Sequence, residues 1–498
     1  MKRTPMIGLL RNSARLCVAA LVLAVAAAPA FARSQAAGLP SARVLMVSDI
    51  HFEPFWDPGK VPQLVAAPVS RWSAILAAPA TADRAARFAA LQHACDARGI
   101  DADYALYMSS LRAMRADGAG ARFITLSGDL LSHDFTCKYA HTMPHATPAA
   151  RQAFAVKTID FVLNELRGTF PGVPLYPALG NNDSGCNDYR FDAGEPYLSA
   201  IGGEFVANVP ARERQQALRD FAAGGYYSVP LPAPMRRTRL LVLNDNFMSS
   251  NYSTCGGKHD AAPAAAQIAW LRQELERATR RHQNVWIMAH IPPGIDPFST
   301  IIHFRNICAG NPPVMFLSSD ALPETIAEFG NVVRLGIFGH THMDELRLLR
   351  STQPGVHEKP VVLKVVPSIS PVDGNNPAFM VARVHAATAT LMDYRVIAAS
   401  NKTGIDTKWS EEYDFDRAYH EAAFSPTTVK QLIAGFRADP GDKTQDSQIY
   451  LRDYFVGDRS EEIKAFWPEY SCALANYTPA TFKACMCPAA QTRAAQGH

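Results

Sequence analysis

The stretch "VVRLGIFGHTH" (332–342) joins an apolar run typical of a strand to a glycine and two histidines. His340 and His342 are two residues apart, so in extended backbone their side chains point to the same side. Gly339 in front of them lets another part of the chain approach the backbone closely. We interpret the stretch as a buried strand whose end carries a pair of metal ligands.

Four other apolar runs end in residues of the same kind. They are "RVLMVSDIH" (43–51) with Asp49 and His51, "ARFITLSGD" (121–129) with Asp129, "VPLYPALGN" (173–181) with Asn181, and "NVWIMAH" (284–290) with His290. Each alone has an ordinary alternative, namely a turn, a helix cap or a hydrogen-bonded core histidine. The carboxyl ends of strands in an α/β sheet meet at one edge, so we expect all of these side chains to converge.

The donor types indicate which metals such a site binds. Carboxylate, amide and imidazole donors without a thiolate suit zinc, with manganese or iron as alternatives. Seven candidate ligands are more than one ion needs. The sequence therefore predicts two divalent metal ions that share a carboxylate, an arrangement that generates hydroxide and stabilises phosphoryl transfer.

The rest of the chain alternates between apolar runs and amphipathic stretches. "RLLVLND" (239–245) and "PVVLKVVPS" (360–368) add two strands, and segments such as 150–168 and 263–283 read as helices. This alternation predicts an α/β core. The composition turns polar near residues 398–407, so we expect a catalytic domain over 43–398 and a small helical subdomain over 405–498.

The first 32 residues have the features of a secretory signal peptide. Basic residues precede an Ala-rich apolar stretch, which ends in Ala30-Phe31-Ala32, and we expect cleavage after Ala32. Cleavage leaves 45 Lys and Arg against 46 Asp and Glu, so the charge gives no signal for nucleic-acid binding. We expect a periplasmic or secreted protein without a transmembrane segment, and the oligomeric state stays open.

The cysteines fit an oxidising compartment. Eight of the nine follow the signal peptide, none in a paired CxxC arrangement, so disulfides are favoured over a zinc site. From their places in the chain we predict that Cys255 pairs with Cys308. We also predict that Cys472 pairs with either Cys485 or Cys487.

In their order along the chain, the motifs DxH, GDxx, GNxD, a separate His and GHxH resemble those of the calcineurin-like metallophosphoesterases. "GDLLSHD" (128–134) and the cysteine-ended tail resemble the acid sphingomyelinase-like phosphodiesterase group in particular. This resemblance implies a metallophosphoesterase β-sandwich flanked by helices. It also implies a ligand set, in which one metal is held by Asp49, His51 and His342, the other by Asn181, His290 and His340, and both by Asp129.

The resemblance implies a phosphoric ester hydrolase, most simply a phosphodiesterase of small phosphorylated substrates. A hydroxide bridging the metals would attack phosphorus, and His133 would assist the leaving group. Asn182 departs from the family pattern, which has His there, and an amide cannot act as a general acid. An endopolyphosphatase, a phosphomonoesterase and a catalytically weakened phosphate-binding protein therefore stay open as alternatives.

Overall fold

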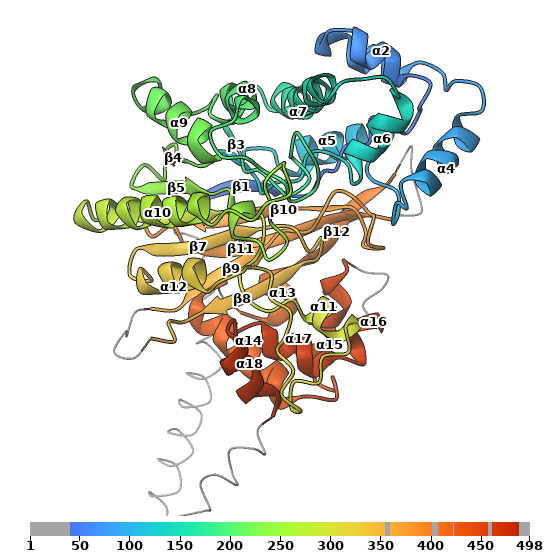
Figure 1. Cartoon of the computed structure of the whole chain (residues 1–498). Helices are drawn as coiled ribbons and strands as arrows, with labels where there is room; N and C mark the ends of the chain where they lie inside the picture. Colours follow the sequence, from blue (N-terminus) through green and yellow to red (C-terminus); the bar gives the residue numbers. More distant parts are fainter. Residues whose placement is uncertain (1–39, 354–358, 401–406, 422, 457–460, 488–498) are drawn as a thin grey trace, which may run out of the picture. The chain divides into compact units, whose positions relative to one another are not determined.

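The computed structural model describes residues 40–353, 359–400, 407–421, 423–456 and 461–487. The predicted signal peptide lies outside these residues. From Ala42 onward the described residues form one compact unit. Its architecture is mixed α/β, with two six-stranded sheets and helices on the outside, as Figure 1 shows.

The first sheet has the strand order β12-β11-β10-β1-β2-β3. Its parallel half pairs β1 with β2 and β2 with β3, and its antiparallel half is the meander β10-β11-β12. The strands are β1 (Ser41–Val47), β2 (Ile124–Leu126), β3 (Leu175–Pro177), β10 (Ala378–His385), β11 (Leu391–Ala399) and β12 (Trp409–Asp414).

The second sheet has the order β4-β5-β6-β7-β9-β8, with β5, β6, β7 and β9 parallel and an antiparallel strand at each edge. Its strands are β4 (Tyr227–Pro230), β5 (Thr238–Val242), β6 (Asn284–Met288), β7 (Val333–Phe338), β8 (Glu345–Leu349) and β9 (Val361–Val365). Each of the seven apolar runs that predicted strands overlaps one of the observed strands, so this part of the prediction is confirmed.

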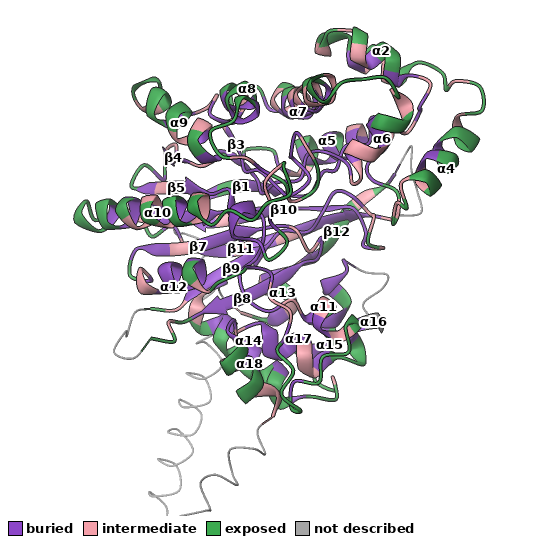
Figure 2. Cartoon of the chain, in the orientation of Figure 1, coloured by how far each residue is buried: buried purple, intermediate pink, exposed green. Residues whose placement is uncertain are grey.

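The two sheets pack face to face. One buried core contains inward side chains of β1 and β10 from the first sheet together with side chains of β6 and β7 from the second. Phe123, just before β2, lies edge-on against Trp286 of β6 with 5.8 Å between ring centroids. Figure 2 shows most strands buried, with exposed residues on the edge strand β12, whereas the outer helix faces are exposed. The predicted sandwich flanked by helices is confirmed.

The helices lie outside the sandwich. Figure 1 shows α7, α8 and α9 on one side of the strands and α14 to α18 on the other. The helices are α2 (Val61–Ala66), α3 (Trp72–Ala77), α4 (Arg84–Ala94), α5 (Tyr104–Asp117), α6 (Phe135–Thr142), α7 (Pro148–Thr169), α8 (Pro196–Phe205), α9 (Ala211–Gly224), α10 (Ala262–Arg280), α11 (Pro297–Ile302), α12 (Ala321–Glu328), α13 (Phe415–Tyr419), α14 (Pro426–Ala438), α15 (Gln445–Tyr454), α16 (Glu461–Lys464), α17 (Trp467–Ala473) and α18 (Pro479–Met486). Short 3₁₀ turns cover Val69–Arg71 and Asp245–Met248.

The region after residue 405 differs from the prediction. The segment "WSEEYD" is not helical but forms the edge strand β12, antiparallel to β11. This segment lies in the subdomain that the sequence predicts to be helical, yet Glu411 forms an ion pair with Arg395 across the strands, 3.0 Å apart. Cross-strand pairing on an exposed edge overrides the weak helix propensity of such a segment. Among the described residues beyond 405, the first helix is α13, which begins at Phe415.

Candidate metal centre

The seven predicted ligands lie at the carboxyl ends of five strands, three in the first sheet and two in the second. They follow β1 (Asp49, His51), β2 (Asp129), β3 (Asn181), β6 (His290) and β7 (His340, His342). Because these strands run parallel within each sheet and the sheets face each other, their ends open onto one site. The structure brings all seven side chains together there.

Two motif glycines bring the ligand loops into close contact. A Cβ atom on Gly180 would lie 2.0 Å from Oδ1 of Asp129, and one on Gly339 would lie 2.5 Å from Oδ2 of Asp49. Neither space admits a methyl group. Asn181 and His340 must therefore each be preceded by a glycine, because the carboxylate of another ligand occupies the space that a side chain would fill.

The backbone of the site is strained. Five non-glycine residues there have positive φ angles, namely Asp49 (47°), His51 (43°), Asp129 (54°), His340 (73°) and His342 (64°). Such conformations cost on the order of 1–3 kcal/mol each and persist only where the surrounding structure imposes them. Hydrogen bonds between the loops impose them here, for example from His51 N to Asp129 O at 2.9 Å.

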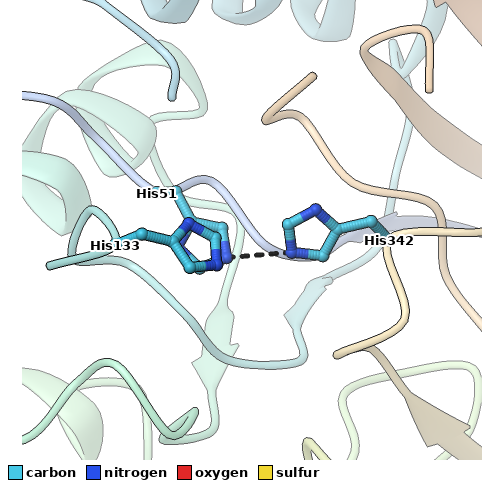
Figure 3. A group of neighbouring side chains, drawn as sticks. All are labelled: His51, His133 and His342. Carbon is cyan, nitrogen blue, oxygen red and sulfur yellow. Dashed lines mark hydrogen bonds between the residues drawn. The ribbon is translucent and has the colours of Figure 1, made fainter. Parts of the chain in front are cut away.

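One group of ligands surrounds Asp49. Its carboxylate oxygen Oδ1 lies 3.8 Å from Nε2 of His51 and 3.6 Å from Nε2 of His342. The two imidazole Nε2 atoms face each other at 3.1 Å, as the dashed line in Figure 3 marks. The backbone N–H of His340 and the hydroxyl of Ser48 donate to the same carboxylate.

The second group surrounds the amide of Asn181. Its Oδ1 lies 3.0 Å from Nε2 of His290 and 2.9 Å from Nδ1 of His340. The amide nitrogen donates to Asp188 at 2.7 Å, which fixes the oxygen toward the histidines. Asp129 lies between the groups, with Oδ2 3.3 Å from His51 Nε2 and 3.2 Å from His290 Nε2.

The donor set fits divalent cations. Nδ1 of His51 lies 2.9 Å from the carbonyl of Leu131, and Nδ1 of His290 lies 2.8 Å from the carbonyl of Ser127, so both Nδ1 atoms donate. In the neutral ring each Nε2 then carries a lone pair. These lone pairs face other acceptors, such as Asn181 Oδ1. Acceptors that face each other in a buried place need either a proton or a metal cation between them.

The pKa values of the site histidines show the influence of the buried carboxylates of Asp49 and Asp129. Burial lowers the pKa of His51, but Asp129 and Asp49 outweigh it and raise that pKa to about 9. The same balance, led by Asp129 against burial, raises the pKa of His290 to about 10. Burial and then the neighbouring His290 lower the pKa of His340 to about 3. The two carboxylates therefore attract positive charge to this place, either as protons or as metal ions.

His133 lies beside the first group and is 18% exposed. Its ring stacks on that of His51, with 4.0 Å between centroids, as Figure 3 shows. Asp101 holds it twice, through Oδ1 to the ring Nδ1 at 3.0 Å and through Oδ2 to the backbone N at 2.8 Å. His133 also lines the cavity that opens above the ligands.

Asn182 is turned toward the centre of the site. Its amide nitrogen donates to Asp129 Oδ2 at 2.9 Å, and its backbone N–H donates to Asp129 Oδ1 at 2.8 Å. It is not among the described residues that line the cavity. Asp183 accepts the backbone N–H groups of Gly180, Leu130 and Leu131 and so fixes the loops that carry Asp129 and Asn181.

A cavity of about 610 Å³ opens above the ligands. The predicted residues on its wall are Asp129, His133, Asn181, His340 and His342. Sequence reasoning missed several other wall residues, which come from loops, from α15 and from strand β8 and carry no motif. They include Arg98, Tyr189, Phe316, Glu345, Arg347, Asp373 and Tyr454.

Four disulfides join all eight cysteines of the described chain. The predicted pair Cys255–Cys308 is wrong: Cys255 bonds Cys186, because the loop after β3 lies against residues 253–255, and Cys308 bonds Cys487. Of the two alternatives for Cys472, the bond to Cys485 is observed. The fourth disulfide is Cys95–Cys137, so these sulfurs are not available to a metal.

A disulfide map of the purified protein checks this pattern. Non-reducing peptide mapping is expected to find Cys186–Cys255 and Cys308–Cys487, and a Cys255–Cys308 peptide would contradict it. Replacing both Cys95 and Cys137 by serine should lower the free energy of unfolding by about 2–4 kcal/mol, because their bond closes a long loop. Urea denaturation measures this loss.

Known proteins resemble this chain over most of its length. "Cyclic GMP-AMP phosphodiesterase SMPDL3A" of Mus musculus is 24% identical over 403 residues, covering 78% of this chain and 82% of that protein. "Acid sphingomyelinase-like phosphodiesterase 3b" of Homo sapiens is 26% identical over 362 residues, covering 67% and 70%. No protein-family model matches the chain.

Among solved structures, a dimetal phosphatase from Danio rerio aligns with 74% of this chain and 98% of its own, at 12% identity and a TM-score of 0.36. Among the described helices, none is long and apolar enough to cross a membrane. The sequence relatives confirm the resemblance of this chain to the acid sphingomyelinase-like phosphodiesterases, and with it the predicted class of phosphoesterase.

Proposed function

We propose that the chain is a secreted phosphodiesterase that uses two divalent metal ions. Asp49, His51 and His342 would hold one ion. Asn181, His290 and His340 would hold the other, with Asp129 shared between them. The observation that carries the proposal is the set of inward-facing acceptors around two buried carboxylates at the floor of the cavity. The four disulfides support secretion into the periplasm or beyond.

When bound, the ions would supply a water deprotonated near neutral pH and positive charge for the phosphoryl oxygens, zinc being the first candidate. The chain's own residues orient the reactants. Asn182 holds both oxygens of Asp129 in place. His133, oriented by Asp101 and open to the cavity, would give a proton to the leaving alcohol.

The proposal is tested by loading the purified protein with zinc or manganese and measuring hydrolysis of phosphate esters. Bis(p-nitrophenyl) phosphate is expected to turn over faster than p-nitrophenyl phosphate or inorganic polyphosphate. A faster monoester would make the chain a phosphomonoesterase, and a faster polyphosphate an endopolyphosphatase. No turnover of any of the three at full metal occupancy would leave a phosphate-binding protein.

Asn182→Ala tests the supporting role of this amide. The variant removes one of the two hydrogen bonds to Asp129 and keeps the backbone bond, so metal affinity or kcat should fall about 10–100-fold. Metal titration followed by assay with bis(p-nitrophenyl) phosphate measures both. Asn208→Ala is a matched control, because that amide accepts a backbone N–H from Leu175 and is not among the described cavity residues. An unchanged Asn182→Ala enzyme would remove Asn182 from the site.

A further inference from the structure

Two consecutive residues of one loop contact two ligands of the second group. The loop, residues 186–192, lies beyond β3. Asp188 Oδ1 accepts the amide N–H of Asn181 at 2.7 Å, and the hydroxyl of Tyr189 lies 3.2 Å from Nε2 of His340. Both residues also line the cavity. One loop therefore supports two of the three side chains that are proposed to hold the same ion.

The contact with Tyr189 leaves the other nitrogen of His340 for a metal ion. Nδ1 of His340 faces Asn181 Oδ1 at 2.9 Å and can bind a cation only through its lone pair. The proton of the neutral ring is then on Nε2, which can donate it to the hydroxyl oxygen of Tyr189. A hydrogen bond at the distal nitrogen fixes both the tautomer and the orientation of a metal-bound histidine.

Asp188 has the corresponding role for the amide of Asn181. An amide can turn either its oxygen or its nitrogen toward a cation, and only the oxygen carries lone pairs for it. Because Asn181 Nδ2 donates to Asp188, Oδ1 points toward Nε2 of His290, 3.0 Å away. Loss of this carboxylate therefore removes the hydrogen bond that selects the orientation of the amide.

The loop is fixed to a neighbouring segment of the chain. The disulfide Cys186–Cys255 joins the two. The backbone N of Ser253 donates to the carbonyl of Tyr189 at 3.3 Å, and the carbonyl of Ser253 accepts from Phe191 N at 3.2 Å. Tyr189 has a φ of 55°, a costly conformation for an aromatic residue, which these contacts impose. The backbone that carries the phenol is therefore held in place.

The first group of ligands is supported by other parts of the chain. Nδ1 of His51 lies 2.9 Å from the carbonyl of Leu131, and Nδ1 of His342 lies 3.3 Å from Asp373 Oδ2. In the described part of the chain, no hydrogen bond or ion pair joins loop 186–192 to the side chains of this group. The two groups therefore have separate supports.

We infer that Asp188 and Tyr189 are positioning residues for one of the two proposed ions, the one held by Asn181, His290 and His340. They set the affinity for this ion by orienting the amide and one imidazole, and they leave the affinity for the other ion unchanged. The inference rests on the proposed two-metal function, because it concerns how one half of that metal site is kept in order.

Tyr189→Phe tests the inference by titration of the metal-free protein with zinc in competition with a chromogenic chelator. The variant loses only the hydroxyl, so the dissociation constant of one ion should rise about 10–100-fold while that of the other stays the same. Asp188→Ala should weaken one ion by a similar factor. Tyr107→Phe is the matched control, because its hydroxyl donates to the carbonyl of Val162 at 2.7 Å and it is not among the described cavity residues. It should bind both ions as the wild type does.

Two ligand variants show which ion is affected. His290→Ala should retain only the ion of the first group, and His51→Ala only the ion of the second. Adding Tyr189→Phe should weaken zinc binding by the His51→Ala protein about 10–100-fold and leave zinc binding by the His290→Ala protein unchanged. A general loosening of the fold would weaken both and would contradict a positioning role.

The outcomes separate the inference from the proposed function. Wild-type protein that binds fewer than two zinc ions at saturation overturns the two-metal proposal and the inference with it. Two ions in the wild type, with neither or both equally weakened in Tyr189→Phe, overturn the inference alone. Where Tyr189→Phe does not fold, as its circular-dichroism spectrum would show, Asp188→Ala decides between the same outcomes.

Discussion

Asp129→Ala is expected to abolish hydrolysis. Asp129 Oδ2 lies within 3.3 Å of histidines in both ligand groups, so its removal takes a shared ligand from both ions. We expect kcat/KM for bis(p-nitrophenyl) phosphate to fall by about 10³-fold or more, because both the ions and the charge they place on the phosphoryl oxygens are affected. Elemental analysis should find two metal ions per wild-type chain and at most one per variant chain.

The fold should survive this change. Asp129 is buried beside Asp49 and Asp183, and burial together with Asp129 raises the pKa of Asp183 to about 7. Removing Asp129 relieves its repulsion of Asp183 but also takes away the acceptor of two hydrogen bonds from Asn182, so a circular-dichroism spectrum should accompany the assay. Asp57→Ala is the control, since Asp57 is also buried but bonds Thr81 and Gly59 and is not among the described cavity residues. It should keep both ions. Wild-type protein that holds a single ion at saturation would end the two-metal proposal.

The site residues that could be predicted are those that follow a strand directly in the sequence, because the geometry of a parallel sheet then fixes where they lie. An apolar run followed by a polar residue, such as Met288 to His290, places that residue at a strand end. Parallel strands then carry all such ends to one edge. Gly180 and Gly339 added a second signal, because each stands where a neighbouring carboxylate leaves no room for a side chain.

Other parts depend on contacts between distant segments that leave no local pattern. Cys186 and Cys255 meet because two loops pair, through the bridge Arg190–Ser253, and nothing near either cysteine encodes this. Edge strand β12 has the composition of a helix and becomes a strand only by pairing with β11. Local propensity is too weak to decide either case.

Residues of the cavity wall could not be predicted either, because no local sequence pattern marks them. Asp101 precedes α5 and looks like an ordinary loop residue, yet it holds His133 through two hydrogen bonds across 32 residues. Glu345 and Arg347 read as charged residues of an exposed strand and are instead buried. Only the folded structure shows that both residues line the cavity beside the metal ligands.

His133→Ala is expected to lower kcat strongly only where the leaving group needs a proton. With an alkyl leaving group, loss of a general acid costs about 10²–10⁴-fold. A p-nitrophenolate leaves readily without protonation, so bis(p-nitrophenyl) phosphate should be hydrolysed at nearly the wild-type kcat. The measurement is kcat for a series of aryl and alkyl phosphodiesters of increasing leaving-group pKa. The plot of log kcat against that pKa should be steeper for the variant.

The steeper slope distinguishes proton donation from positioning. A histidine that only places the phosphate would lower all members of the series equally, and parallel lines would therefore assign His133 to binding. Asp101→Asn sharpens the test, because it keeps the size of the group that holds Nδ1 of His133 and weakens its charge. It should move the slope in the same direction by a smaller amount. His141→Ala, an exposed histidine that is not among the described cavity residues, should leave the slope unchanged.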